Sequence, residues 1–286
     1  MMHEEPIRFG VVGGDSRQVW LVHSLLEDGH VVFTAGLENA PLDSRARPAP
    51  LEELARHSDA VILPLPVTSD GVHINGPFSR EPMVLDNRTA SLFLGKNVFG
   101  GMTDRLYRSS PGWEKVFIRD YFQREELTVR NAVPTAEGAI QIAMEESPGT
   151  LNGARCLVTG YGRIGKVLAH MLQGLGAEVT VSARKPEDLA WIRLSGCKAV
   201  HTRRPGGGYE LVFNTVPAMV FNRETLSQLA PDTLLIDLAS APGGVDHQAA
   251  EELGIRVIPA LSLPGRVAPK TAGEIIKETI YHMMEE

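Results

Sequence analysis

The sequence Gly160-Tyr161-Gly162-Arg163-Ile164-Gly165 lies between an apolar run, Arg155–Thr159, and a helical pattern, Lys166–Leu175. A strand that enters a helix through glycines at this spacing is typical of dinucleotide-binding α/β domains. The first glycine permits the tight turn, the second lets a pyrophosphate approach the backbone, and the third lets the helix pack on the strand. The helix N-terminus offers N–H groups and a partial positive charge to the phosphates. The six residues of the motif therefore predict a dinucleotide site in a parallel sheet.

A similar pattern opens the chain, where Ile7–Val12 predicts a strand, Gly13-Gly14-Asp15-Ser16 a turn, and the apolar spacing from Val19 to Leu26 a helix. Further strands are predicted at Val31–Thr34, Ala60–Leu63, Ala177–Val181, Leu211–Asn214, Leu234–Asp237 and Ile255–Ile258. Strands that alternate with helices indicate parallel sheets. We therefore expect an α/β protein with two doubly wound parallel-sheet, Rossmann-like domains and a cleft between them.

Two helices are candidates for the connections between these domains, at Thr135–Glu146 and at about Lys270–Met284. We expect residues 1–130 to form an N-terminal, Rossmann-like substrate domain and residues 131–267 an NAD(P)-binding domain. Residues 268–286 would then form a helix that packs back toward the first domain. Residues 64–88 are rich in Pro, Gly, Ser and Asp and follow a strand end, where open parallel sheets bind ligands. They are therefore a candidate ligand loop, and the alternative is a mobile surface loop.

The composition of the 286 residues, 43% hydrophobic and 22% charged, is that of a soluble globular protein. The net charge of −7 and the lack of a basic run argue against nucleic acid or an anionic membrane as a partner. The N-terminus lacks the apolar segment of a signal peptide, and no apolar run approaches a membrane span. Two cysteines, Cys156 and Cys197, fit a reducing compartment, so we expect a cytoplasmic protein.

The end of the strand that follows the glycine motif discriminates between cofactors, and it contains Ser182, Arg184 and Lys185 but no carboxylate before Glu187. An NAD site usually places Asp or Glu there to hold the ribose 2′-hydroxyl. A serine hydroxyl beside two cations instead suits a 2′-phosphate, which the guanidinium of Arg184 can bind with two hydrogen bonds. We therefore predict NADP rather than NAD. In the alternative interpretation, Arg184 and Lys185 are solvated charges in a turn.

Two other strand ends are expected to shape the nicotinamide pocket. Asn214, Thr215, Val216 and Pro217 follow one strand, and Asp237 ends the next. Asn214 or Thr215 is a candidate to hydrogen-bond the ribose or the carboxamide. Strand-end Asn and Asp residues also serve as turn caps, so this alternative stays open.

Five segments occur in a distinctive order: Gly13–Gln18, Pro134–Gly138, Gly160–Gly165, Asp237–Gly244 and Leu263–Gly273. Together they resemble the A subunit of dipicolinate synthase from spore-forming bacteria, over nearly the whole chain. The resemblance implies formation of pyridine-2,6-dicarboxylate from a dihydro- or hydrated tetrahydro-dipicolinate of the lysine pathway, with NADP as oxidant. It also implies a role in sporulation and a second, flavoprotein-like B subunit. Residues 37–50 and 67–91 match no motif of this family.

A dicarboxylate substrate requires cations or helix N-termini. Candidates are the backbone N–H groups from Gly14 to Arg17, the Arg17 side chain, Arg266 in a loop, and Lys270. Lys270 lies in the first turn of the last helix, where a cation is unfavourable against the helix dipole, so a substrate carboxylate would explain it. The alternatives are that the glycines are simple turn formers and that Lys270 is an ordinary exposed lysine.

Candidates for proton transfer are Asp15, Ser16, Glu137 and Lys270, with Thr135 as a further substrate contact. Asp15, and Thr135 with Glu137, also fit plain helix-capping roles. The histidines show no clear cluster, and metal-ligand, nucleophile-elbow and Walker spacings are absent from the sequence.

Two rival functions remain open. One is a two-domain dehydrogenase for a 2-hydroxy acid or a folate-like substrate, and the other is a non-catalytic NADP(H)-binding regulatory protein. A homo-oligomer is also expected, because Ile276, Ile280 and Met283 form an apolar helix face that would pack on a neighbour or on the chain's own domain.

Overall fold

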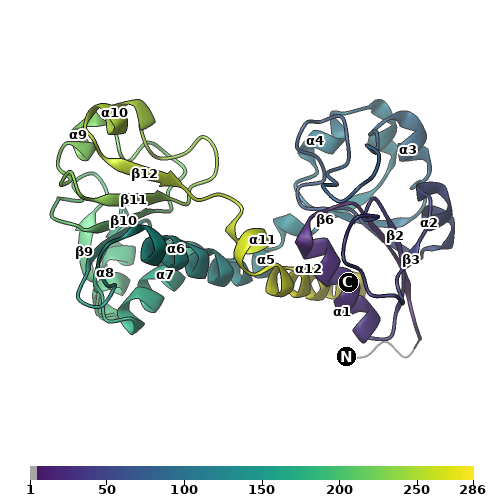
Figure 1. Cartoon of the computed structure of the whole chain (residues 1–286), viewed down its shortest axis with the longest axis horizontal. Coiled ribbons are helices and arrows are strands. Elements are labelled where there is room, and N and C mark those ends of the chain that lie inside the picture. Colours follow the sequence, from purple (N-terminus) through teal and green to yellow (C-terminus); the bar gives the residue numbers. More distant parts are fainter. Residues whose placement is uncertain (1–4) are drawn as a thin grey trace. The chain divides into compact units, whose positions relative to one another are not determined.

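The computed structural model describes residues 5–286, which form two compact units. One unit combines the chain up to Arg130 with Ala268–Glu286, and the other is Asn131–Val267. Each unit contains a six-stranded parallel sheet with flanking helices (Figure 1). The doubly wound, Rossmann-like α/β fold predicted from the strand–helix alternation is therefore confirmed.

The first unit has the strand order β3-β2-β1-β4-β5-β6. Its strands are β1 (Arg8–Val12), β2 (Val31–Ala35), β3 (Arg47–Pro48), β4 (Ala60–Ile62), β5 (Asn97–Gly100) and β6 (Ile118–Asp120). Its helices are α1 (Ser16–Glu27), α2 (Leu51–His57), α3 (Asn87–Ser91), α4 (Asp104–Tyr107), η1 (Pro111–Lys115), η2 (Tyr121–Gln123), α5 (Glu125–Arg130) and α12 (Pro269–Glu285). The strand order reverses between β1 and β4, which is where such sheets bind ligands.

The second unit has the same topology, with the order β12-β11-β10-β7-β8-β9. Its strands are β7 (Arg155–Thr159), β8 (Glu178–Ala183), β9 (Lys198–His201), β10 (Leu211–Asn214), β11 (Leu234–Asp237) and β12 (Arg256–Pro259). Its helices are α6 (Ala132–Glu146), α7 (Arg163–Gly174), α8 (Pro186–Leu194), α9 (Arg223–Leu226), α10 (His247–Glu252) and α11 (Leu263–Val267). The order reverses here between β7 and β10.

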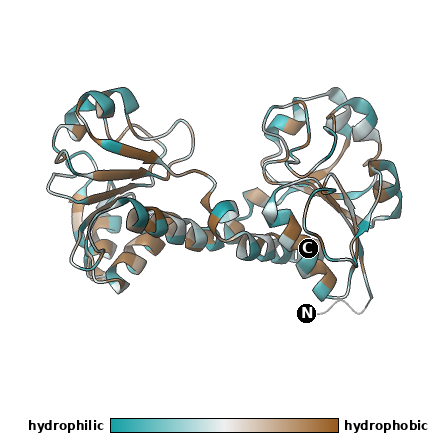
Figure 2. Cartoon of the chain, viewed as in Figure 1, coloured by the Kyte–Doolittle hydropathy of each residue, from teal (hydrophilic) through white to brown (hydrophobic). Residues whose placement is uncertain are grey.

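Each sheet buries both of its faces, as parallel sheets do. In Figure 2 the strands are largely hydrophobic, while the helices are hydrophobic on one side and hydrophilic on the other. Phe9 and Val11 pack toward α1 and α12, and Val12 belongs to the core on the opposite face of the same sheet. No helix among residues 5–286 is long and apolar enough to cross a membrane.

The terminal helix α12 completes the core of the first unit. A Cβ on Gly273 would lie 2.6 Å from the carbonyl oxygen of Arg17, so glycine permits the close crossing of α1 and α12. The face formed by Ile276, Ile280 and Met283 is buried in this core. Of the two roles considered for these residues, the structure shows packing on their own domain. They therefore provide no free face for a neighbouring protomer.

Two predicted boundaries were wrong in ways that affect candidate residues. Helix α6 begins at Ala132 instead of Thr135, so Thr135 lies inside the helix and its hydroxyl donates to the carbonyl of Asn131 (2.7 Å). The capping arrangement expected for Thr135 and Glu137 does not exist. Arg266 lies on the short helix α11 and not in a loop. The strands β3, β5, β6 and β9 were not predicted.

Candidate functional site

The glycine turn of the second unit has the geometry that a dinucleotide requires. Gly160 has φ +91°, a conformation that favours glycine. A Cβ on Gly165 would lie 2.1 Å from the carbonyl oxygen of Gly160, so only glycine lets α7 pack this closely on β7. A Cβ on Gly162 would meet nothing within 4 Å, so the backbone faces open space there.

The N-terminus of α7 is uncapped. Its N-cap is Gly162, and no side chain accepts a hydrogen bond from the first turn. Tyr161 and Ile164 are half-buried and pack against the core, whereas Arg163 is exposed. Lys166 places its ammonium 5.3 Å from the centre of the Tyr161 ring, which brings a further cation to this turn. Unpaired N–H groups at a helix N-terminus, open space and nearby cations fit the pyrophosphate of a dinucleotide.

The end of β8 presents two cations and no carboxylate. Arg184 and Lys185 are exposed, and neither side chain makes a hydrogen bond or ion pair with any described residue. The expectation for Ser182 was wrong. Side chains alternate along a strand, and Ser182 is fully buried with no hydrogen-bond partner for its hydroxyl in the described part of the chain. Ser182 is therefore not accessible to a 2′-phosphate at the exposed turn.

A buried chain of hydrogen bonds crosses the carboxyl ends of three strands. Thr159 donates to Asn214 Oδ1 (2.6 Å), and Asn214 Nδ2 donates to Asp237 Oδ1 (2.8 Å). The three residues are register partners across β7, β10 and β11. Thr159 was not among the predicted site residues. The available signal was a polar residue at the end of an apolar strand.

This chain of hydrogen bonds corrects the role expected for Asn214. The side chain is fully buried, and its amide also binds the backbone carbonyl and N–H of Val216 (both 3.2 Å). It is therefore not available to bind a ribose or carboxamide. The Thr215 hydroxyl donates to the carbonyl of Thr159 (2.7 Å), and Pro217 is exposed at the rim. Asn214 thus holds the carboxyl ends of β7, β10 and β11 together.

The glycine turn of the first unit is already occupied by the protein. The sequence suggested that the N–H of Gly14 binds a substrate carboxylate. In the structure this N–H donates to the carbonyl of Asn75 (2.7 Å) and is not free. Asp15 caps α1 by accepting from the N–H of Arg17 (3.0 Å). Ser16 follows the cap, half-buried.

Arg17 is held by internal partners. Its guanidinium pairs with the carboxylate of Asp15 (2.8 Å) and also donates to the carbonyl of Leu65, while only 11% of the side chain is exposed. These contacts tie the start of α1 to the segment that follows β4. The expected binding of a substrate carboxylate by Arg17 would have to use the small exposed part of this side chain.

The remaining candidates are divided between the two units. Lys270 is exposed in the first turn of α12, and its ammonium lies 5.7 Å from the centre of the Trp20 ring. This cation–π contact offsets the unfavourable helix dipole without a substrate. Thr135, Glu137 and Arg266 belong to the other unit, where Glu137 and Arg266 are exposed.

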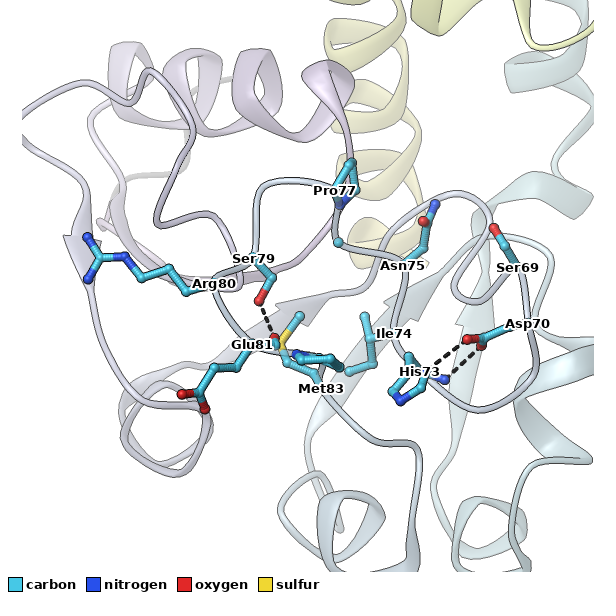
Figure 3. Close-up of a pocket in the computed structure, with 12 residues that line it drawn as sticks. Ser69, Asp70, His73, Ile74, Asn75, Pro77, Ser79, Arg80, Glu81 and Met83 are labelled. Atoms are coloured by element: carbon cyan, nitrogen blue, oxygen red, sulfur yellow. Dashed lines mark hydrogen bonds and ion pairs between the residues drawn. The ribbon is translucent and has the colours of Figure 1, made fainter.

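A pocket of the first unit lies in the segment after β4, where a ligand loop was considered from the sequence. The β4–α3 loop (residues 63–86) forms an open pocket of about 440 Å³ lined by polar and apolar side chains (Figure 3). Its walls include Asp70, His73, Asn75 and Arg80. The spacing of Asp70 and His73 was the available signal, but it is too common to stand out in a sequence. No group of three or more His, Cys, Asp and Glu residues within 5–286 could hold a metal.

The duplicated Rossmann topology and the uncapped glycine turn define a two-domain protein of the dinucleotide-binding class. The family model for the N-terminal domain of the dipicolinate synthase A subunit matches residues 8–109. The dipicolinate synthase A subunit of Bacillus subtilis (strain 168) is 32% identical over 98% of this chain and 96% of its own length. This chain belongs to the family of dipicolinate synthase A subunits.

Solved structures agree with this assignment. The dipicolinate synthase A chain from Bacillus subtilis superposes with a TM-score of 0.86 at 30% identity, covering 99% of this chain and 97% of that one. The dipicolinate synthase A subunit from Bacillus halodurans superposes with a TM-score of 0.88 at 29% identity and 98% coverage of both chains.

Proposed function

We propose that this chain is an NADP-dependent oxidoreductase that forms dipicolinate from dihydrodipicolinate or its hydrated precursor, as the A subunit of a dipicolinate synthase. The observation that carries the proposal is the uncapped turn at Gly162 followed, at the end of the next strand, by Arg184 and Lys185 without a carboxylate. Membership in the family of A subunits supplies the product class. We place this reaction in the cytoplasm of a sporulating cell.

The residues at this turn have distinct tasks in the proposal. The first N–H groups of α7 bind the pyrophosphate at Gly162, and Arg184 with Lys185 binds the 2′-phosphate. Asp237, Thr215, Val216 and Pro217 form the strand ends that border the nicotinamide. When bound, the nicotinamide accepts a hydride, and the chain's task is to hold the ring dicarboxylate and to take up the proton released on aromatisation.

Cofactor choice is tested by calorimetric titration of the purified chain with NADP⁺ and NAD⁺. Wild type is expected to bind NADP⁺ more tightly, and Arg184→Ala to remove that preference by about 1–3 kcal/mol, the cost of losing a charged hydrogen-bond partner. Arg193→Ala, on the last turn of α8, is the matched control and should leave both affinities unchanged. Equal binding of NAD⁺ by wild type would refute the NADP assignment.

Catalysis requires a second test, because a non-catalytic dinucleotide-binding protein would bind NADP⁺ equally well. We propose that a flavoprotein-like B subunit is the partner of this chain. Turnover of dihydrodipicolinate should be followed at the absorbance of NADPH, with and without this partner. Tight binding of NADP⁺ without reduction under either condition would support the non-catalytic alternative, and turnover of simple 2-hydroxy acids would support the dehydrogenase alternative.

A further inference from the structure

The β4–α3 loop forms a fixed pocket beside the strand-order switch of the first unit. The N–H of Val67 donates to Gly101 (2.9 Å) and that of Asn75 to Val67 (2.8 Å). The Asn75 carbonyl in turn accepts from Gly14 (2.7 Å), and Arg105 of α4 donates to the carbonyl of Ser69 (2.7 Å). The pocket is therefore anchored at both ends to the carboxyl edge of the sheet, where open parallel sheets bind ligands.

A histidine and an aspartate lie together in this pocket (Figure 3). His73 Nδ1 lies 2.8 Å from Asp70 Oδ2. In the neutral ring, this hydrogen bond places the proton on Nδ1, because the carboxylate can only accept. His73 Nε2 then carries a lone pair, and it has no hydrogen-bond partner among the described residues. The side chain is 39% exposed, so a ligand can reach it.

The carboxylate of Asp70 is itself held in place. Its second oxygen, Oδ1, accepts from the N–H groups of Val72 and His73 (both 2.8 Å) and from the Thr68 hydroxyl (3.2 Å). Thr68 is buried, and its Oγ1 accepts from the N–H of Gly71 (2.9 Å). These bonds, first that from the His73 N–H and next that from its ring, hold the pKa of Asp70 well below its usual range. Asp70 therefore stays ionised and can stabilise an imidazolium.

The wall of the same pocket also contains Arg80. The backbone N–H of Arg80 donates to Glu38 (3.2 Å), which fixes this part of the loop. The guanidinium of Arg80 makes no hydrogen bond or ion pair within residues 5–286, and the side chain is exposed. Glu81 also belongs to the wall, and the Arg80 side chain extends away from His73 (Figure 3). An oriented base in an accessible pocket suits a substrate that must lose a proton.

We propose that His73 is the catalytic base of the reaction and that Asp70 positions it. This inference rests on the proposed function for its reaction. The dihydropyridine ring loses a hydride, for which the oxidised nicotinamide is the acceptor, and a proton from a neighbouring carbon. His73 Nε2 forms a bond to that proton, and the electron pair of the broken C–H bond becomes the new ring double bond.

Binding is tested without nucleotide, so that the outcome does not depend on the proposed cofactor. Dipicolinate is titrated into the chain in metal-free buffer while the histidine ring protons are followed by NMR, with His73→Gln used to assign the signal. The His73 resonance should shift saturably, and His57, which is exposed and stacks on Phe33, should not move. A His73 signal that stays in place would overturn the proposal.

Catalysis is tested in wild type and His73→Ala with the B subunit present. The variant should lose about 10²–10⁴-fold in kcat, the usual contribution of a general base, while its Kd for NADP⁺ stays unchanged. Imidazole in the buffer should restore part of the lost kcat, a response that a purely structural role would not give. Asp70→Asn should reduce kcat by a smaller factor, and His57→Ala should have no effect.

The outcomes separate the two proposals. If His73→Ala keeps the kcat of wild type, or loses kcat that imidazole does not restore, His73 is not the base. Either result leaves the proposed oxidoreductase function intact. No turnover in wild type would refute the proposed function, and the NMR titration would still decide whether the pocket binds a pyridine dicarboxylate beside His73.

Discussion

The two units begin with the same strand–glycine turn–helix arrangement but treat the helix N-terminus in opposite ways. In the first unit, Asp15 caps α1 and the N–H of Gly14 binds the carbonyl of Asn75. In the second unit, Gly162 leaves α7 without a side-chain cap, and the space in front of it is open. Both helices contain 12 residues, so their dipoles are comparable. The N–H groups of Gly14 and Arg17 are thus used by the protein itself, whereas no side chain caps the first turn of α7.

The difference shows that glycines in a strand–helix turn are not sufficient for an anion site. What matters is whether the protein itself already satisfies the N–H groups of the turn. In the first unit a carboxylate one residue after Gly14 and a carbonyl from the long β4–α3 loop do so. The same loop creates the pocket at His73, so the first unit has its candidate ligand site in the loop instead of the turn.

The largest expected effect comes from giving the second turn the cap of the first. Gly162→Asp has open space for its side chain and a φ of −84°, so we expect the fold to be kept, with stability changed by only a few tenths of a kcal/mol. The carboxylate would occupy the N–H groups and repel the pyrophosphate. Calorimetry should show a loss of NADP⁺ affinity of at least about 100-fold, equivalent to two charged hydrogen bonds at roughly 1.5 kcal/mol each.

Gly162→Asn is the matched variant, because it has the same shape and capping ability without the charge. Its affinity should lie between those of wild type and Gly162→Asp. If the Asp variant binds NADP⁺ as well as wild type does, the uncapped turn is not the pyrophosphate site.

The sequence was sufficient to predict the elements whose structure depends on local residue types. The glycine turn, the strand alternation and the last helix were predicted correctly, because apolar periodicity and glycine geometry are local properties. The burial of Ser182 and Asn214 was not predicted, because it depends on which face of a sheet a strand-end residue occupies. A shift of one residue in the predicted end of a strand reverses that face.

The pocket and its dyad lie beyond local reasoning for a different reason. Asp70 and His73 are close in sequence, but their importance depends on the hydrogen bonds of Asn75 to Gly14 and Val67, which fold the loop over the sheet edge. The capping of α1 could be predicted from Asp15. The hydrogen bond from the Gly14 N–H to Asn75, 61 positions away, could not.

The next largest effect should follow from removing the cap of the first turn. Asp15→Ala removes both the cap of α1 and the carboxylate partner of the nearly buried Arg17. We expect a loss of about 1–3 kcal/mol in the free energy of unfolding, measured by urea denaturation. Asp43→Ala is the control, since Asp43 makes the same contacts with Arg45 two residues on, but that arginine is 56% exposed. It should cost much less stability than Asp15→Ala does, and equal losses would contradict the role of burial.

Acid should distinguish the units by a smaller effect. Burial acts to raise carboxyl pKa values, but hydrogen bonds from cations and backbone N–H groups hold several below their usual range. In the described part of the first unit these are Asp28, Glu38, Asp43, Asp59, Asp70, Asp86, Glu126 and Glu286. In the second unit the corresponding group is Glu210. A lowered pKa stabilises the fold above the unfolded-state pKa, and this stabilisation is lost as the pH falls through the folded-state pKa.

The first unit should therefore open before the second as the pH falls below about 4. Pepsin digestion between about pH 5 and pH 2, with the fragments identified by mass spectrometry, should give early cleavage within residues 5–130. Early cleavage within residues 131–267 would contradict the expected order. Asp28→Asn should reduce the acid sensitivity, because it removes a carboxylate that accepts from Lys277 and Tyr281.

The smallest effect is expected at Ser182, where the two interpretations of the NADP turn make opposite predictions. If Ser182 bound the 2′-phosphate, Ser182→Ala would weaken NADP⁺ binding about as much as Arg184→Ala. Because its hydroxyl is buried without a hydrogen-bond partner among the described residues, we expect unchanged affinity for NADP⁺ and a gain in stability of up to about 1 kcal/mol from removing an unsatisfied polar group. Calorimetry and urea denaturation of the same sample measure both quantities. A selective loss of NADP⁺ affinity would mean that β8 shifts on binding to expose this hydroxyl.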